Sequence, residues 1–204
     1  MKKVNRSIVV LAMVVAGVVI AGAGVASAQD VYKVNYFDTN IATIKGFSVP
    51  DATVRIDNPG LTYGNLCAMI YVFAADQQLS ECCGCVETHN GLRKLSVRTN
   101  LTSNPLTGVV PTSGVIKVIS AAVNNSPCDP TSNVTPKANL RVWATHIQGG
   151  TTLGSFGGLV WPVTETESSD STLGATELAN LQAQCAFVNI LGSGAGICSC
   201  GTGD

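Results

Sequence analysis

The chain has 204 residues, of which 46% are hydrophobic and only 12% are charged, and its formal net charge is -1 at pH 7. This composition excludes an intrinsically disordered protein, which combines low hydrophobicity with high charge, and it excludes the basic surface of a nucleic-acid-binding protein. Eight cysteines are many for a cytosolic domain of this size, so they indicate an oxidising compartment.

The N-terminus has the pattern of an export signal. Three basic residues precede an uncharged run over 8–24, and Ala26-Ser27-Ala28 is an A-x-A cleavage site. We therefore predict a signal peptide over residues 1–28 that is cleaved and a single mature domain over 29–204. An uncleaved anchor is the alternative, because the apolar run is nearly long enough to span a bilayer. The predicted location is secreted, extracellular or at the cell surface, with the periplasm left open and no membrane span after cleavage.

Short β-strands dominate the mature chain, and turn residues separate them. Segments 31–37 and 92–101 alternate between apolar and polar residues, whereas 66–74 is an unbroken apolar run typical of a strand buried on both faces. Further strands are predicted at 53–57, 79–87, 114–123, 138–147 and 159–163. Together they predict a mainly β domain, an antiparallel β-sandwich of immunoglobulin-like or jelly-roll-like type.

The C-terminal part is different in character. Residues 164–171 are polar and acidic and predict a surface loop that contains Glu165, Glu167 and Asp170. An apolar stripe at helical spacing then predicts a helix over about 175–191 that ends at Gly192 and packs on the sandwich. A glycine-rich tether, 192–196, leads into a tail with two cysteines.

The cysteines predict four disulfides, because all eight follow the export signal. A hairpin turn centred on Asp76 places Cys67 opposite Cys85, and we expect the tail to bond to the 82–85 region. Cys128 and Cys185 then remain as partners. The candidate disulfide cysteines are Cys67, Cys82, Cys83, Cys85, Cys128, Cys185, Cys198 and Cys200.

A metal or redox site is the alternative use of these thiols. The 82–85 group and the two tail cysteines offer soft ligands that suit copper or zinc, and His89 lies nearby in the sequence. The spacing differs from a C-x-x-C pair of zinc ligands, and export favours oxidation, so we predict no metal and no cofactor.

Familiar catalytic motifs are absent from the sequence. It has no H-E-x-x-H, no G-x-S-x-G and no phosphate-binding glycine loop. Of the two histidines, His146 alternates onto the same face as Val142 and Ala144, and His89 lies in a turn. We therefore predict that the protein is not an enzyme.

Trp143 is the most conspicuous candidate for a binding surface. By alternation it faces outward beside Arg141, and these two residue types are enriched where binding energy concentrates. A flat indole also stacks on sugars. The alternative is that the C-terminal helix covers this face.

Two kinds of partner follow from these features: cell-surface glycans and a second copy of the chain. Segment 31–37 lies close to the mature N-terminus, so it either completes its own sheet or pairs with the open edge of a neighbour. The low net charge predicts no nucleic-acid partner.

The segments Leu66-Cys67-Ala68, Cys82-Cys83-Gly84-Cys85 and Gly192-Ser193-Gly194-x-Gly196-Ile197-Cys198 resemble those of uncharacterised secreted bacterial proteins with a cysteine-rich β domain. The resemblance implies export and the cysteine pattern but no particular activity. The sequence thus predicts a non-enzymatic extracellular or cell-surface protein with a structural or adhesive role. A carbohydrate-binding module and a metal or redox protein are the alternatives.

Overall fold

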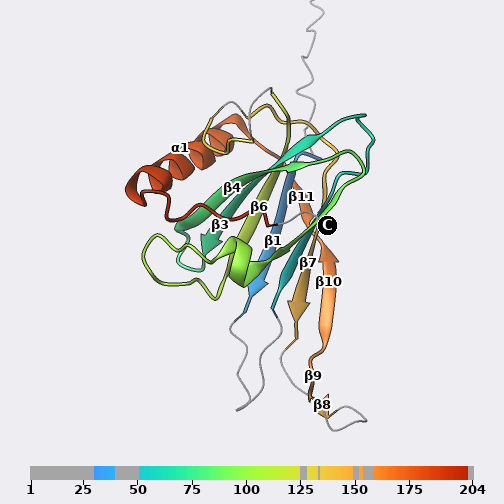
Figure 1. Cartoon of the computed structure of the whole chain (residues 1–204), viewed down its shortest axis with the longest axis vertical. Helices are drawn as coiled ribbons and strands as arrows, with labels where there is room; N and C mark the ends of the chain where they lie inside the picture. The colour runs from blue at the N-terminus through green and yellow to red at the C-terminus, as the bar shows by residue number, and fades with distance from the viewer. Residues whose placement is uncertain are drawn as a thin grey trace, which may run out of the picture.

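The computed structural model describes residues 30–39, 51–124, 128–132, 134–148, 152–153 and 159–201. The predicted signal peptide, residues 1–28, lies outside this part of the chain. The described residues form two antiparallel sheets, one short strand pair and one C-terminal helix (Figure 1).

The larger sheet has five strands in the order β11-β1-β6-β3-β4. The strand β3, which lies between β6 and β4, is the predicted apolar run, and the first seven of its nine residues are buried. This burial reflects the cover that β3 has on both faces. The strands are β1 (Tyr32–Asp38), β3 (Leu66–Ala74), β4 (Leu79–Glu87), β6 (Ser113–Ala122) and β11 (Ser169–Ser171).

The smaller sheet has four strands in the order β10-β7-β2-β5. They are β2 (Thr53–Asp57), β5 (Leu92–Ser96), β7 (Arg141–Ile147) and β10 (Val163–Glu167). A separate pair is formed by β8 (Thr152–Leu153) and β9 (Leu159–Val160), so the predicted strand at 159–163 is divided between β9 and β10.

The two sheets face each other across one apolar core. Ile56, Leu95 and Val142 of the smaller sheet contact the same core cluster as Ile70 and Val118 of the larger one, and all are buried. Ile56, Leu95 and Val142 lie on the inward face that the alternation of their strands predicts, whereas β3 and β6 are apolar on both faces.

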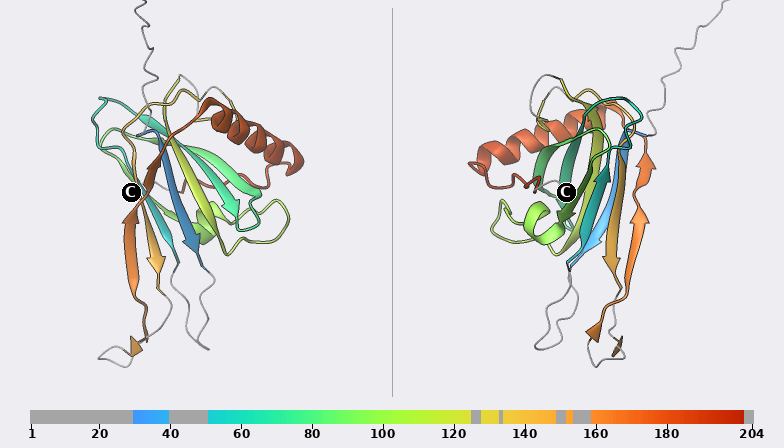
Figure 2. Two further views of the ribbon diagram at one scale, coloured as in Figure 1. Left: turned by 180° about the vertical axis from the view of Figure 1, so that it is seen from behind. Right: turned by 45° about the vertical axis from the view of Figure 1, so that its right-hand side comes forward.

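The helix α1 (Ala175–Leu191) begins and ends where the sequence predicts and packs on the outer face of the five-stranded sheet. Leu181, Cys185 and Val188 are buried there beside Met69 and Tyr71 of β3. Figures 1 and 2 show α1 on the side of β3, β4 and β6 that faces away from β7 and β10. The helix therefore does not cover the face that carries Trp143. No helix in the described ranges is long and apolar enough to cross a membrane.

The predicted strand 92–101 is only half correct. The strand β5 ends at Ser96, and Val97–Leu101 forms a π-helical turn, η1. The Ser96 hydroxyl accepts a hydrogen bond from the Thr99 N–H at 3.0 Å, and the Asn100 side chain accepts one from the Ser96 N–H at 2.8 Å. Short polar side chains that bond the nearby backbone in this way favour turns over strands. Val97 and Leu101 stay buried because residues four apart share a face of a helical turn.

The predicted loop 164–171 was wrong, because these residues form β10 and β11. The chain leaves the smaller sheet at the end of β10 and joins the larger sheet in β11, and the Ser168 N–H between them donates to the Val142 carbonyl at 2.8 Å. Threonine at alternate positions favours a strand, and each acidic side chain forms an ion pair. The pairs are Glu165 with Arg55, Glu167 with Arg141 and Asp170 with Lys33.

Candidate functional site

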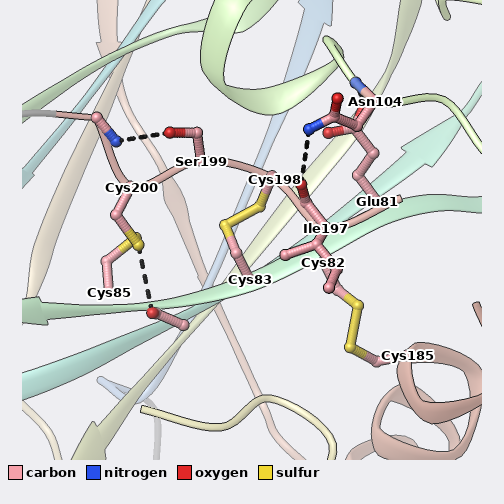
Figure 3. Close-up of a disulfide and its surroundings, with 12 residues drawn as sticks. Glu81, Cys82, Cys83, Cys85, Asn104, Cys185, Ile197, Cys198, Ser199 and Cys200 are labelled. Carbon is pink, nitrogen blue, oxygen red and sulfur yellow. Dashed lines mark hydrogen bonds between the residues drawn. A yellow bond between two sulfur atoms is a disulfide. The ribbon is translucent and has the colours of Figure 1, made fainter. Parts of the chain in front are cut away.

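The C-terminal tail adds a short parallel segment to β4, the edge strand of the larger sheet. The Cys82 N–H donates to the Gly196 carbonyl at 2.9 Å, and the Cys198 N–H donates to the Cys82 carbonyl at 3.3 Å. The Asn104 side-chain amide donates to the Ile197 carbonyl at 3.1 Å (Figure 3). The tail thereby covers backbone groups that an edge strand otherwise leaves open to another chain.

Four disulfides use all eight cysteines. Cys83–Cys198 and Cys85–Cys200 bond the tail to β4, as the sequence predicts, and Cys82–Cys185 bonds β4 to α1 (Figure 3). The fourth disulfide, Cys67–Cys128, bonds β3 to the chain that follows β6.

The predicted pairs Cys67–Cys85 and Cys128–Cys185 were wrong. The ladder between β3 and β4 shifts by one residue at Val72 and Phe73, so Cys67 lies opposite Val86 instead of Cys85. A shift of one residue moves a side chain to the other face of the sheet. Cys67 and Cys82 therefore belong to the outer cluster beneath α1, whereas Cys83 and Cys85 belong to the core between the sheets.

Arg93 of β5 joins the two sheets beside this tail. Its guanidinium donates to the Cys200 carbonyl at 2.6 Å, to the Val86 carbonyl at 2.8 Å and to the Glu87 carboxylate at 2.6 Å. Glu87 is buried, and burial raises the pKa of its carboxyl to about 7 although Arg93 acts in the opposite direction. The two sheets are thus linked along both edges. Arg93 and the tail link β5 to β4 along one edge, and the chain passes from β10 to β11 along the other.

The outer face of the smaller sheet is a candidate binding surface. Trp143 of β7 is partly exposed and lies opposite Arg55 of β2 in the strand register. A hollow of about 420 Å³ opens here, and its lining includes side chains from all four strands. The lining residues are Arg55, Asp57, Leu92, Trp143 and Glu165.

Arg141, the predicted neighbour of Trp143, does not line this hollow. It lies opposite Asp57 and pairs with Glu167 at 3.8 Å. The arginine that lines the hollow is Arg55, and its guanidinium forms an ion pair with the Glu165 carboxylate. Burial raises the pKa of Asp57, and the nearby Arg141 opposes this rise. The outward alternation of Arg55 was visible in the sequence, but its place beside Trp143 depends on which strands pair.

His146 lies inside, on the same face of β7 as Val142 and Ala144, as predicted. Its ring stacks on Tyr36 with centroids 4.1 Å apart, and its Nε2 lies 2.8 Å from the Thr166 hydroxyl. Burial lowers the pKa of this imidazole. His89 is exposed at the surface, where its ring lies 6.3 Å from that of Tyr63.

In the described part of the chain, one group of residues has the side-chain types and spacing that a metal ion requires, and it consists of three cysteine sulfurs. The sulfur atoms of Cys83, Cys85 and Cys200 lie within 4.8 Å of one another, and His89 is not among them. All three sulfurs are in disulfides, so a metal would need them to be reduced first.

Glu81 is a buried ionisable residue that was not among the candidate residues predicted from the sequence. It is fully buried in β4, and burial raises the pKa of its carboxyl to about 8. Its Oε1 accepts the Asn104 N–H at 3.2 Å, whereas Oε2 has no hydrogen-bond partner among the described residues. The signal available in the sequence was an acid, Glu81, directly before the first of three cysteines in a predicted strand.

Comparison with known protein-family models, curated proteins and solved structures found no match for this chain.

Proposed function

We propose that the chain is an exported, non-enzymatic protein of the cell exterior or cell surface with an adhesive role. The outer face of the four-stranded sheet would be its binding surface. One observation carries this proposal: a tryptophan lies in a hollow on the sheet face that α1 leaves uncovered. Tryptophan and arginine together are typical of surfaces where binding energy concentrates.

The disulfides support a place outside the cytosol. Four disulfides in one domain are stable in an oxidising compartment and are rare where thiols are kept reduced. The predicted export signal agrees with this location, and the periplasm is the other compartment that permits such bonds.

We further propose that the packed sheets are a β-sandwich of immunoglobulin-like or jelly-roll-like type. Support comes from the shared core and from the strand that leaves one sheet at Glu167 and enters the other at Ser169. Such transfers between sheets occur in sandwich folds.

Adhesion can be tested with the oxidised mature domain, residues 29–204, carrying a fluorescent label. We expect it to bind isolated bacterial cell envelopes, and we expect Trp143→Ala to weaken that binding at least tenfold. Phe187→Ala is the matched control, because Phe187 is an exposed aromatic residue on α1, away from this face. Equal binding by wild type and Trp143→Ala would contradict the proposal.

A metal or redox protein is the second candidate, favoured by the sulfur cluster of Cys83, Cys85 and Cys200. Mass spectrometry of the exported protein, without and with reduction, separates the two candidates. A gain of eight hydrogen atoms on reduction supports four disulfides, whereas free thiols with one bound zinc or copper ion support the metal site.

A further inference from the structure

The hollow around Trp143 has the chemistry of a sugar-binding site. We propose that it binds a neutral glycan chain, an inference that rests on the proposed role of this face in adhesion. The juxtaposition that carries it is an indole bordered by a guanidinium and two carboxylates on an open sheet face.

The lining matches the two kinds of surface that a pyranose ring presents. The ring has faces of apolar C–H groups, which pack on an indole and on an aliphatic side chain such as Leu92. Its rim carries hydroxyl groups, which donate to carboxylates and accept from a guanidinium. Asp57, Glu165 and Arg55 supply these partners at the edge of the same hollow.

The ion pair between Arg55 and Glu165 prepares the site for such a ligand. It links β2 to β10 across the strand that carries Trp143, so the guanidinium is held beside the indole before any ligand arrives. An arginine has five N–H donors, so the pair leaves donors available for hydroxyl groups. A preorganised polar group loses less conformational freedom on binding.

The balance of charge on this face points to a neutral ligand. Trp143 and its outward neighbours in the register carry three positive and three negative side chains. An anionic polymer would be favoured by an excess of basic residues, which this face does not have. The six charged residues are Arg55, Lys94, Arg141, Asp57, Glu165 and Glu167.

The extent of the hollow favours a chain over a single sugar. Its lining comes from β5, β2, β7 and β10, and four adjacent strands span roughly 14 Å. The volume of about 420 Å³ is within the range of ligand sites in proteins. Because the site is an open hollow, we expect weak affinity for each chain and strong attachment only where many copies bind one surface.

The experiment is titration of the oxidised mature domain with cellohexaose, chitohexaose, maltohexaose, mannohexaose and xylohexaose, followed by calorimetry and by tryptophan emission. The chain has two tryptophans, so the emission arm uses Trp161→Phe to isolate Trp143. We expect at least one hexasaccharide to bind and to shift the emission. Trp143→Ala should weaken that binding at least tenfold, whereas Trp143→Phe should retain most of it. Phe187→Ala should bind as wild type does.

Failure of this inference is distinguishable from failure of the proposed function. If Trp143→Ala abolishes attachment to envelopes and none of the five hexasaccharides binds, the proposed adhesive role is supported and the proposed neutral-glycan ligand is wrong. Binding only to an anionic polymer, polygalacturonate or heparin, would overturn the neutral ligand. Hexasaccharide binding that Trp143→Ala leaves unchanged would overturn the site.

Discussion

Glu81 shows how one residue can set the pH dependence of stability. Its folded pKa, about 8, lies above the ordinary value of 4.5, so the folded protein holds this proton over a pH range in which the unfolded chain has lost it. Its contribution to stability is therefore fully present below about pH 4.5 and is lost as the pH rises through 8. The orphaned Oε2 and the fully buried position explain why the ionised form is unfavourable here.

We predict that Glu81→Gln raises the melting temperature at pH 8 and has little effect at pH 4. The amide keeps an acceptor for the Asn104 N–H but carries no charge. A gain of about 1 kcal/mol would correspond to roughly 2–4 °C in a domain of this size. Thermal unfolding from pH 4 to pH 8 measures it, with the exposed Glu167→Gln as the control. If wild type and Glu81→Gln lose stability equally as the pH rises, Glu81 is not the source.

His146 gives the opposite sign. Burial lowers its folded pKa below the ordinary value of 6.5, so the unfolded chain binds the proton more readily. Its contribution to stability is present above pH 6.5 and is lost on acidification. At low pH the imidazole between Tyr36 and Thr166 has to take up a proton and become charged in its buried position. Glu81 therefore stabilises the folded protein at low pH, and His146 stabilises it at high pH.

At the scale of the elements, the tail and β4 share two disulfides that close almost the same loop. Cys83–Cys198 and Cys85–Cys200 each span 115 residues of sequence. A disulfide stabilises mainly by restricting the unfolded chain, so a second one in nearly the same place restricts little more. The effects of these two bonds on stability should therefore be strongly non-additive.

We predict that Cys83→Ser/Cys198→Ser and Cys85→Ser/Cys200→Ser each lower the stability by much less than the removal of both bonds. Loss of both should lower it by about 3 kcal/mol, because Cys82–Cys185 still closes most of the same loop, and should make the chain sensitive to protease from Gly192 onward. Thermal unfolding and limited proteolysis report the two effects. Equal and additive losses from the two pairs would contradict the shared-loop explanation. An unchanged melting temperature without either bond would show that the tail does not stabilise the fold.

At the scale of the whole molecule, β1 has a neighbour on each side. It pairs with β6 over seven positions and with β11 over three, all within its own chain. Its loss would leave unpaired edges on both sides and would remove Tyr32 and Phe37 from two buried clusters. Exchange of this strand between copies is the alternative to this intramolecular arrangement.

We predict that deletion of residues 29–37 unfolds the domain. The physical reason is the interior position of β1 between β11 and β6, which no other described strand can occupy without disrupting its own pairs. Circular dichroism and size-exclusion chromatography of the oxidised protein before and after deletion measure fold and size. A deleted chain that stays folded while polymers of the intact chain disappear would instead establish strand exchange.

The elements themselves were predictable where local pattern decides them. The bounds of β2, β3, β4 and α1 agree with the sequence prediction, because alternation, an apolar run and helical spacing act within a few residues. The predictions for two other segments were wrong, one for a local reason and one for a long-range reason. Side-chain hydrogen bonds turned 97–101 into η1, and ion pairs with distant residues allowed an acidic segment to form β10 and β11.

By itself the sequence determined a β-rich domain with one helix, an even set of cysteines and a tail bonded to the 82–85 region. Only the tertiary structure decided which cysteines meet, which sheet α1 covers and which residues surround Trp143. Each of these depends on the register and order of strands far apart in the chain, and local periodicity does not specify either one. The shift at Val72 and Phe73 changed the partners of Cys67 and Cys85, and the pairing of β2 with β7 brought Arg55 to Trp143. The candidate site is a property of that packing.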